Sequence, residues 1–417
     1  MPERKTPQVR FKGFTDTWEQ RKLGALMDVG SVKRVHQSDW RDSGVRFLRA
    51  RDVVADFNNE EPDDYLYIDQ KMYEEYSAQS GKVQQGDLLV TGVGTIGIPM
   101  LIKSEKPLYF KDGNIIWFKN KNAIDGQFFY YSFISKGIQD FIKESAGTGT
   151  VGTYTIDSGK KTPINLPTSI EEQKEIGIYF KNIDHLITLH QREGERLQMI
   201  KKSMLENCFP KNGEKVPRFR FAGFTGDWEQ RKLGDFCEMF NGDRGINYPK
   251  DSDMVQAGIP FVNAGDLQEG KVNLATANKI TREKFDQLGG AKIKRGDILY
   301  CLRGTLGKNA FVDNFDEGTV ASSLVDIRPK NVDAQYLFTV LNSDIEYRQR
   351  ILCDEGAAQP NLSARNLANF DIPVPKIAEQ VKIGRYFESL SNIITLHQSK
   401  LKMLKKIKES MLGKMLV

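Results

Sequence analysis

At 417 residues, the chain is too long for one compact core and fits two domains of ordinary size with connecting elements. Its 39% apolar and 28% charged residues exclude a disordered or fibrous protein, and no apolar run is long enough to cross a bilayer. A formal net charge of +5 is compatible with a polyanionic partner but does not require one.

An internal repeat organises the sequence. The segment from Arg10 to Gly24 returns as the segment from Arg220 to Gly234, and only three of its fifteen positions differ. The motif Gly-Asp-Leu-Leu at Gly86 has a counterpart, Gly-Asp-Ile-Leu at Gly296, and the separation is again 210 residues. The chain therefore uses one unit twice.

Each repeat is predicted to be a mixed α/β (α+β) domain. Short runs rich in Val, Ile, Tyr and Phe, bounded by Gly and Pro, predict strands. The runs that begin at Asp125 and Asp333 predict short helices with the aspartate as N-cap.

The run from Gly92 to Gly97 has the glycine spacing of a dinucleotide-binding fingerprint. The residues that follow are apolar and include Pro99, so they cannot supply the helix N-terminus that binds a pyrophosphate. We therefore predict a tight turn between two strands, with Thr91 and Arg303 near the rim of this turn and of its repeat.

A long helix is predicted to end each repeat, from about Ser169 and from about Ala378. Ser169 and Glu172 have capping-box spacing, and Pro373 and Pro375 prevent an earlier start of the second helix. We divide the chain into a first domain (1–166), a first helix (167–209), a linker (210–218), a second domain (219–374) and a second helix (375–417).

Both helices carry a seam of residues seven apart, which is typical of a helix pair. The seam positions are Ile176, Ile183, His190, Leu197 and Met204 in the first helix and Ile383, Leu390, His397, Leu404 and Met411 in the second. A second set is predicted three residues further on, with Leu186 and Ile393 among its members. We expect the helices to pair with each other, and we interpret the two histidines as a polar layer that fixes their register rather than as metal ligands.

The sequence contains no convincing catalytic motif. A phosphate loop and the tetrapeptide of amino-methylating enzymes are absent, no paired histidines have metal spacing, and four cysteines without CxxC spacing argue against zinc and disulfides. We expect no metal site and a cytoplasmic protein. One alternative is a nuclease that uses Asp63, Asp69 and Lys71, although the second repeat has no counterpart to them. Another is an adaptor that binds only protein.

Polar residues that differ between the repeats are the candidates for DNA contacts. Arginine can bridge guanine O6 and N7, asparagine can bridge adenine N6 and N7, and lysine neutralises phosphate. The candidates are Lys33, Arg34, Arg46, Arg49, Arg51, Thr91, Lys111 and Asn114 in the first repeat and Arg244, Asn263, Arg303, Lys308 and Ser322 in the second.

The repeated motifs resemble those of the specificity subunit of type I restriction-modification systems. The resemblance rests on the opening segments at Arg10 and Arg220, the Gly-Asp-Leu/Ile-Leu motifs, and Glu-Gln-x-x-Ile at the start of each long helix. It extends over essentially the whole chain and both repeats.

The resemblance implies a non-catalytic DNA reader with two target-recognition domains, each of which reads one half of a split DNA site. It implies that the two helices pair antiparallel and that their length sets the spacer between the half-sites. Two modification subunits are expected to dock on the chain, and restriction subunits to join them. S-adenosylmethionine, ATP and Mg are expected on those partners, and no cofactor in this chain.

Overall fold

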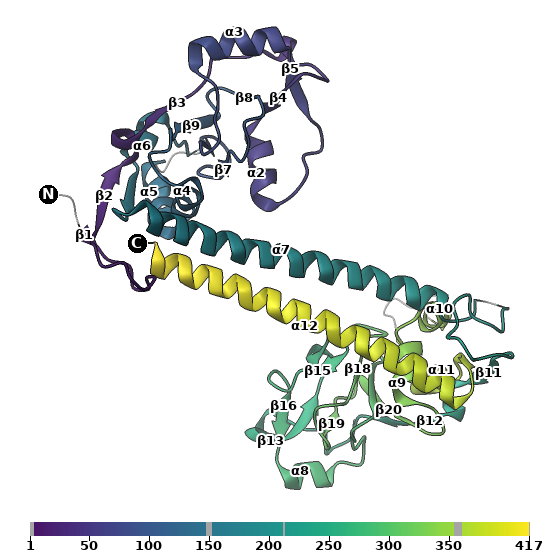
Figure 1. Cartoon of the computed structure of the whole chain (residues 1–417). Coiled ribbons are helices and arrows are strands. Elements are labelled where there is room, and N and C mark those ends of the chain that lie inside the picture. Colours follow the sequence, from purple (N-terminus) through teal and green to yellow (C-terminus); the bar gives the residue numbers. More distant parts are fainter. Residues whose placement is uncertain (1–3, 147–151, 212, 354–360, 417) are drawn as a thin grey trace. The chain divides into compact units, whose positions relative to one another are not determined.

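The computed structural model describes residues 4–146, 152–211, 213–353 and 361–416 and divides into two compact units. The first unit comprises Met1–Gln191 and Ser399–Val417, and the second comprises Arg192–Gln398. Two long helices, α7 (Ile170–Asn207) and α12 (Ile377–Met415), each contribute one segment to both units. Each unit therefore contains one α/β domain and two helix segments (Figure 1).

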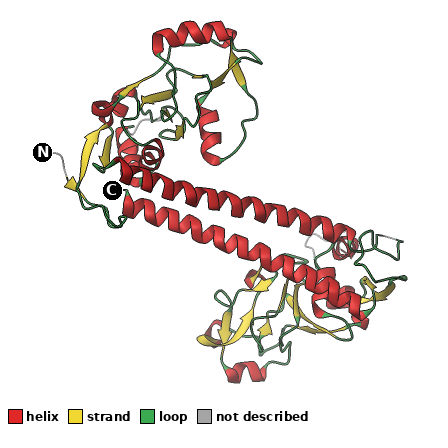
Figure 2. Cartoon of the chain, in the orientation of Figure 1, coloured by secondary structure: helices red, strands yellow, loops and turns green. Residues whose placement is uncertain are grey.

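The first domain contains three small sheets flanked by short helices (Figure 2). A four-stranded antiparallel sheet has the order β3 (Asp28–Gly30), β9 (Ile115–Lys119), β6 (Leu88–Thr91), β7 (Pro99–Leu101). The other two sheets have the orders β5 (Leu66–Ile68), β4 (Val45–Leu48), β8 (Leu108–Phe110) and β1 (Arg4–Lys5), β2 (Trp18–Lys22), β10 (Pro163–Leu166). The helices are α1 (Leu23–Leu26), α2 (Ala50–Asn58), α3 (Gln70–Ser80), α4 (Gly126–Phe133), α5 (Lys136–Ser145) and α6 (Ile156–Lys161).

The second domain is also built from three sheets. The largest has the order β12 (Cys237–Asn241), β20 (Leu324–Pro329), β17 (Ile298–Cys301), β18 (Asn309–Phe311), β15 (Lys271–Val272), β14 (Leu267–Gln268). The others have the orders β16 (Asn278–Ile280), β13 (Met254–Val262), β19 (Thr319–Val320) and β11 (Glu229–Lys232), β21 (Asp371–Val374). The helices are α8 (Arg282–Gln287), α9 (Ala334–Val340), α10 (Asp344–Cys353) and α11 (Ala364–Ala368).

The two domains share one topology. The order β3-β9-β6-β7 of the first domain matches β12-β20-β17-β18 of the second, which adds β15 and β14 at one edge. Strands β4 and β13 each pair antiparallel with one neighbour and parallel with the other. The prediction of a duplicated mixed α/β domain is therefore confirmed.

The glycine-rich run after β6 is a turn, as predicted. It connects β6 to the antiparallel strand β7, and the equivalent run connects β17 to β18. Gly94 and Gly97 have φ angles of 78° and 77°, which are accessible to glycine at little cost. The turn therefore serves chain reversal between strands rather than the binding of a pyrophosphate.

The repeated opening segments are fastened to the long helices by the same ion pair in both units. Arg10 binds Glu172 of α7 through two hydrogen bonds of 2.5 and 2.7 Å, and Arg220 binds Glu379 of α12 through two of 2.8 Å. Both glutamates are almost fully buried. This pairing explains the Glu of the repeated Glu-Gln motif, because a buried carboxylate needs a charged partner.

The Gln of the same motif fastens each short helix to its long helix. The side-chain oxygen of Gln173 accepts the backbone N–H of Asp125 at 2.9 Å, and that of Gln380 accepts the N–H of Asp333 at 3.0 Å. Asp125 and Asp333 cap α4 and α9, as predicted. Gly384 lies so close that an added Cβ would be 2.6 Å from Asp333 Oδ1. The motif is therefore a structural joint.

The long helices face each other within each unit. In the first unit, Lys408 Nζ of α12 lies 2.6 Å from Asp184 Oδ1 of α7. In the second unit, Lys201 Nζ of α7 donates to Ser391 Oγ of α12 at 2.9 Å. These contacts join the later part of one helix to the earlier part of the other, so the helix segments run antiparallel. No helix in the described part of the chain is long and apolar enough to cross a membrane.

Every seam residue lies at least partly buried. Ile176, Ile183, Leu197, Ile383 and Leu390 are buried, whereas His190, Met204, His397, Leu404 and Met411 are half-buried. The second set of the predicted stripe is wrong at two positions, because Leu186 and Ile393 are 43% and 45% exposed. The buried positions instead lie four residues after a seam residue: Phe180, Phe387 and Ile394 are buried.

Candidate nucleic-acid interface

Three of the candidate arginines in the first domain form a cluster of ion pairs. Arg46 and Arg49 contact Asp52 at 3.3 and 3.0 Å, and Arg49 also reaches Asp64 at 3.0 Å. Arg51 pairs with Asp64 as well. Asp52 is buried and accepts the backbone N–H of Arg49, so this cluster closes the turn between β4 and α2. Each of the three arginines therefore has a carboxylate partner within the domain.

A more open group lies where β8 ends. Arg34 extends from the loop after β3, with 70% of its side chain exposed, and pairs with Asp112 at 2.8 Å. The Lys33 ammonium lies 4.2 Å above the ring of Tyr76, and that of Lys111 lies 5.7 Å from the ring of Trp40. The backbone carbonyl of Lys33 accepts a hydrogen bond from the hydroxyl of Tyr109 in β8. The structure therefore brings Lys33, Arg34 and Lys111 together.

Thr91 and Asn114 contribute to the glycine turn. Thr91 is fully buried, and its hydroxyl accepts the N–H of Ile98 at 2.9 Å and donates to the carbonyl of Thr95 at 2.5 Å. It lies inside the turn rather than at its rim. The Asn114 carbonyl accepts the N–H of Gly92 at 2.8 Å, which holds β9 beside the turn.

Three of the five candidates of the second domain lie just after the ends of strands. Asn263 follows β13, Ser322 lies two residues after β19, and Arg303 lies two residues after β17. Backbone hydrogen bonds from Ala321 to Val262 and from Leu302 to Ser323 hold these strand ends side by side.

Two further contacts connect the remaining candidates. Arg244 Nη2 donates to the carbonyl of Ser322 at 3.2 Å, and Lys308 Nζ donates to the carbonyl of Ala264, next to Asn263, at 2.9 Å. The structure therefore groups all five residues at one end of the domain.

A groove with a volume of about 730 Å³ lies at the same end and is lined by Arg244 and Arg303. Arg365, the second residue of α11, lines it as well. The sequence comparison did not select Arg365, because it lies beyond the strands in a Ser-Ala-Arg-Asn run. A change of charge between the repeats could have indicated Arg365, since Asp157 is the second residue of the corresponding helix α6.

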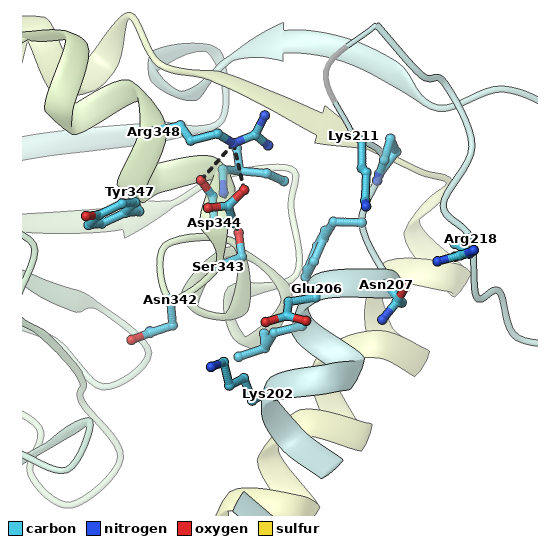
Figure 3. A pocket seen from close by; sticks show the side chains of 14 residues that line it. Lys202, Glu206, Asn207, Lys211, Arg218, Asn342, Ser343, Asp344, Tyr347 and Arg348 are labelled. Atoms are coloured by element: carbon cyan, nitrogen blue, oxygen red, sulfur yellow. Dashed lines mark hydrogen bonds and ion pairs between the residues drawn. The ribbon is translucent and has the colours of Figure 1, made fainter. Parts of the chain in front are cut away.

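A larger pocket, of about 930 Å³, lies between the end of α7, the following linker and the start of α10. Figure 3 shows its mixed lining, with Lys202, Lys211 and Arg218 beside Glu206. Arg348 pairs with Asp344 at 2.7 Å. The lining of this pocket includes none of the residues that the sequence predicts for DNA contacts.

The acidic residues of the nuclease alternative have local roles. Asp69 caps α3 by accepting the N–H of Lys71 at 2.8 Å, and Asp63 is exposed in a loop. The described residues contain no group of three His, Cys, Asp or Glu side chains placed to hold a metal ion. His190 and His397 lie half-buried in the helix seam.

Comparison with known proteins shows which family has this architecture. The family model of the type I restriction modification DNA specificity domain matches the chain twice, over residues 15–199 and 225–406. The chain belongs to this family. Each match starts within or just after a repeated opening segment and ends within a long helix, so the family's domain corresponds to the domain-plus-helix repeat.

Named members of the family are similar over most of their length. The type I restriction enzyme MjaIX specificity subunit of Methanocaldococcus jannaschii is 23% identical over 95% of this chain and 92% of its own. The MjaVIII specificity subunit of the same organism is 25% identical over 72% of this chain and 71% of its own. The crystal structure of the S subunit of a type I restriction-modification system from M. genitalium has the same fold, with a TM-score of 0.59, 16% identity and 99% coverage of both chains.

Proposed function

We propose that the chain is the DNA sequence-specificity subunit of a type I restriction-modification complex, without catalytic activity of its own. The observation that carries this proposal is the contrast between framework and loops. The Arg–Glu joint and the capped short helix recur in both units, whereas the charged residues at the strand ends differ. A shared frame with two different surfaces suits a protein that reads two different half-sites.

We assign the reading of the half-sites to residues 1–166 and 219–374. The helices α7 and α12 set the spacer and offer docking surfaces to two modification subunits, and restriction subunits complete the complex. S-adenosylmethionine, ATP and Mg belong to those partners in this proposal. The family membership of the chain and the duplicated match to the family model support the assignment. The complex acts in the cytoplasm, where its DNA substrate lies.

Exchange of one variable region tests the modular reading. Residues 235–365 are replaced by the corresponding region of another family member, and the chimera is expressed with its modification partners. The methylated motif, determined by methylome sequencing, should change in one half-site and keep the other half-site and the spacer. The reason is that the exchange leaves the first domain and both Arg–Glu joints in place.

The matched control exchanges residues 25–157, the equivalent stretch of the first repeat, and should change the opposite half-site. A chimera that alters both half-sites, or methylates the parental motif, would contradict the modular proposal.

A further inference from the structure

Most arginines of the second domain have a carboxylate partner. Among the described residues from 219 to 374, seven of the ten arginines form such ion pairs. The paired residues are Arg220, Arg231, Arg282, Arg295, Arg328, Arg348 and Arg350. Arginines that face a polyanion should be the exceptions, because an internal carboxylate would compete with phosphate.

The three exceptions line one groove. Arg244, Arg303 and Arg365 come from three separate segments of the chain and meet in the 730 Å³ groove at the end of the domain. All three residues are exposed, and among the described residues Arg244 donates to the carbonyl of Ser322 and has no ion-pair partner. Within the described part of the chain, neither Arg303 nor Arg365 has an ion-pair partner.

The groove contains one carboxylate, and hydrogen bonds engage both of its oxygens. Asp243 accepts the backbone N–H of Gly245 at 3.0 Å through Oδ1 and that of Gly289 at 2.9 Å through Oδ2. These bonds lower the pKa of Asp243, so it stays ionised at neutral pH and fixes the loop that carries Arg244. The net charge of the lining remains positive.

The backbone also holds the other two arginines in place. Arg303 forms a β-bridge with Asn361, and the N–H of Leu362 donates to the carbonyl of Leu302 at 3.1 Å. Ser363 then caps α11 by accepting the N–H of Asn366 at 3.0 Å. The turn after β17 and the helix that carries Arg365 are therefore joined, so little backbone ordering is needed to bind a ligand.

The corresponding place in the first domain has different chemistry. Its equivalent β-bridge joins Val93 to Thr153, so Val93 stands where Arg303 stands. Asp157 takes the place of Arg365, and Arg34 takes the place of Arg244 but is paired with Asp112. Among the described residues of the first domain, the three groove arginines of the second domain are thus matched by an apolar residue, an acidic residue and an arginine that is already paired.

We propose that this groove binds the DNA backbone, with the guanidinium groups of Arg244, Arg303 and Arg365 contacting successive phosphates beside the second half-site. The proposal rests on the proposed function of the chain as a DNA reader. It adds that the two domains bind the backbone differently, because the described residues at the equivalent place in the first domain do not repeat the three unpaired arginines.

The test uses the full chain assembled with its modification partners and a fluorescent duplex that carries the methylated motif. Binding is measured by anisotropy at a series of salt concentrations for the parent, Arg303→Ala, Arg365→Ala and the double variant. Each lost phosphate contact should weaken binding roughly fivefold near 0.15 M salt and reduce the slope of log K against log salt by about 1. The methylated motif should not change.

Arg282→Ala and Arg295→Ala are the matched controls, because these arginines are exposed in the same domain but pair with Glu317 and Asp316. They should bind like the parent. Parental affinity and salt slope in the Arg303 and Arg365 variants would overturn the groove proposal and leave the reading function intact. A changed second half-site at an unchanged salt slope would replace phosphate contact by base reading. Failure of the parental complex to bind its motif specifically would instead contradict the proposed function.

Discussion

Glu172 and Glu379 show how a single residue can fix a domain to its helix. Each is almost completely buried, and each receives two hydrogen bonds from an arginine more than 150 positions away in the chain. The hydrogen bonds that Arg220 donates to Glu379 raise the pKa of Arg220, and those that Arg10 donates to Glu172 raise the pKa of Arg10, so both arginines remain charged throughout the physiological range. The opening repeat therefore attaches each domain to its long helix.

Removal of one partner should expose the cost of this burial. Arg220→Met keeps an aliphatic side chain of similar length but leaves the Glu379 carboxylate without its charged partner, which should cost about 3 kcal/mol of unfolding free energy. Urea denaturation followed by circular dichroism measures the loss. Hydrogen exchange should increase in the second unit only, because the first keeps its Arg10–Glu172 pair.

The double variant Arg220→Met with Glu379→Leu should recover part of the lost stability, since no buried charge remains. Arg282→Met, at an exposed pair, should leave the unfolding free energy unchanged. Equal losses in the single and double variants would show that the packing of Arg220, and not its charge, fixes the joint.

Residue type alone did not distinguish arginines that fold the protein from those that are free to bind. The sequence predicts DNA contacts for Arg46 and Arg49 as it does for Arg244, yet in the structure the first two share Asp52 as an ion-pair partner. The sequence predicts that arginines are available at these positions, but the partner depends on which strand ends the fold brings together. Arg49, for example, also pairs with Asp64, which lies fifteen positions away, beyond helix α2.

At the scale of secondary-structure elements, the helix seam contains a lysine in each unit. Lys201 and Lys408 occupy equivalent positions four residues beyond the seam residues Leu197 and Leu404. Lys408 pairs with Asp184, whereas Lys201 donates to the hydroxyl of Ser391 and has no carboxylate partner among the described residues, and burial lowers the pKa of Lys201. The two ends of the helix pair are therefore built alike but differ in charge compensation.

A carboxylate at position 391 should strengthen the second unit. Ser391→Asp reproduces the Asp184–Lys408 arrangement, and a cavity of about 300 Å³ lined by both Lys201 and Ser391 gives the longer side chain room. The gain should be about 1 kcal/mol, at the low end for a charged hydrogen bond because the site is only partly buried. An aspartate would raise the pKa of Lys201, so the gain is present at neutral pH and is lost as pH rises through that pKa.

Thermal unfolding of the full chain at pH 7 and at pH 11 measures this effect. The reciprocal variant Asp184→Ser should lower stability, because Lys408 and the hydroxyl of Tyr131 both lose their partner. An unchanged melting temperature in both variants would show that the polar contacts in the seam contribute nothing to stability.

The length and pairing of the long helices could be predicted from the sequence, but not which residues complete the seam. Leu186 and Ile187 are adjacent and both apolar, so spacings of three and four fit the pattern equally well. The fold uses the spacing of four, because Ile187 and not Leu186 packs against the core of the first unit. Only the position of the facing helix decides between them.

At the scale of the whole molecule, the same backbone contact joins the end of a long helix to the segment before the opening repeat in both units. The linker makes the chain continuous at this contact in the second unit but not in the first. In the second unit, the N–H of Phe219 donates to the carbonyl of Asn207 at 2.9 Å, across the linker that follows α7. In the first unit, the N–H of Gln8 donates to the carbonyl of Lys414 at 2.8 Å, and these residues belong to opposite ends of the sequence. Met415 and Leu416 are buried in the first unit, as Cys208 and Phe209 are in the second.

This equivalence predicts that the chain can be opened at the linker and closed at its ends. In such a permutant, Val417 is connected to Lys5 by the sequence Lys-Asn-Gly-Glu, which precedes Lys215 in the linker after α7. The new chain begins at Glu214. Fold and reading should both survive, since the backbone hydrogen bonds and buried residues that close each unit are kept and the new ends at Gly213 and Glu214 are exposed. The permutant should therefore unfold within a few degrees of the parent and direct methylation to the same motif.

A control opened between Phe128 and Phe129, both fully buried in α4, should not fold. Loss of the second half-site from the methylated motif of a folded permutant would mean that the continuity of the linker, and not only its contacts, positions the second domain on DNA.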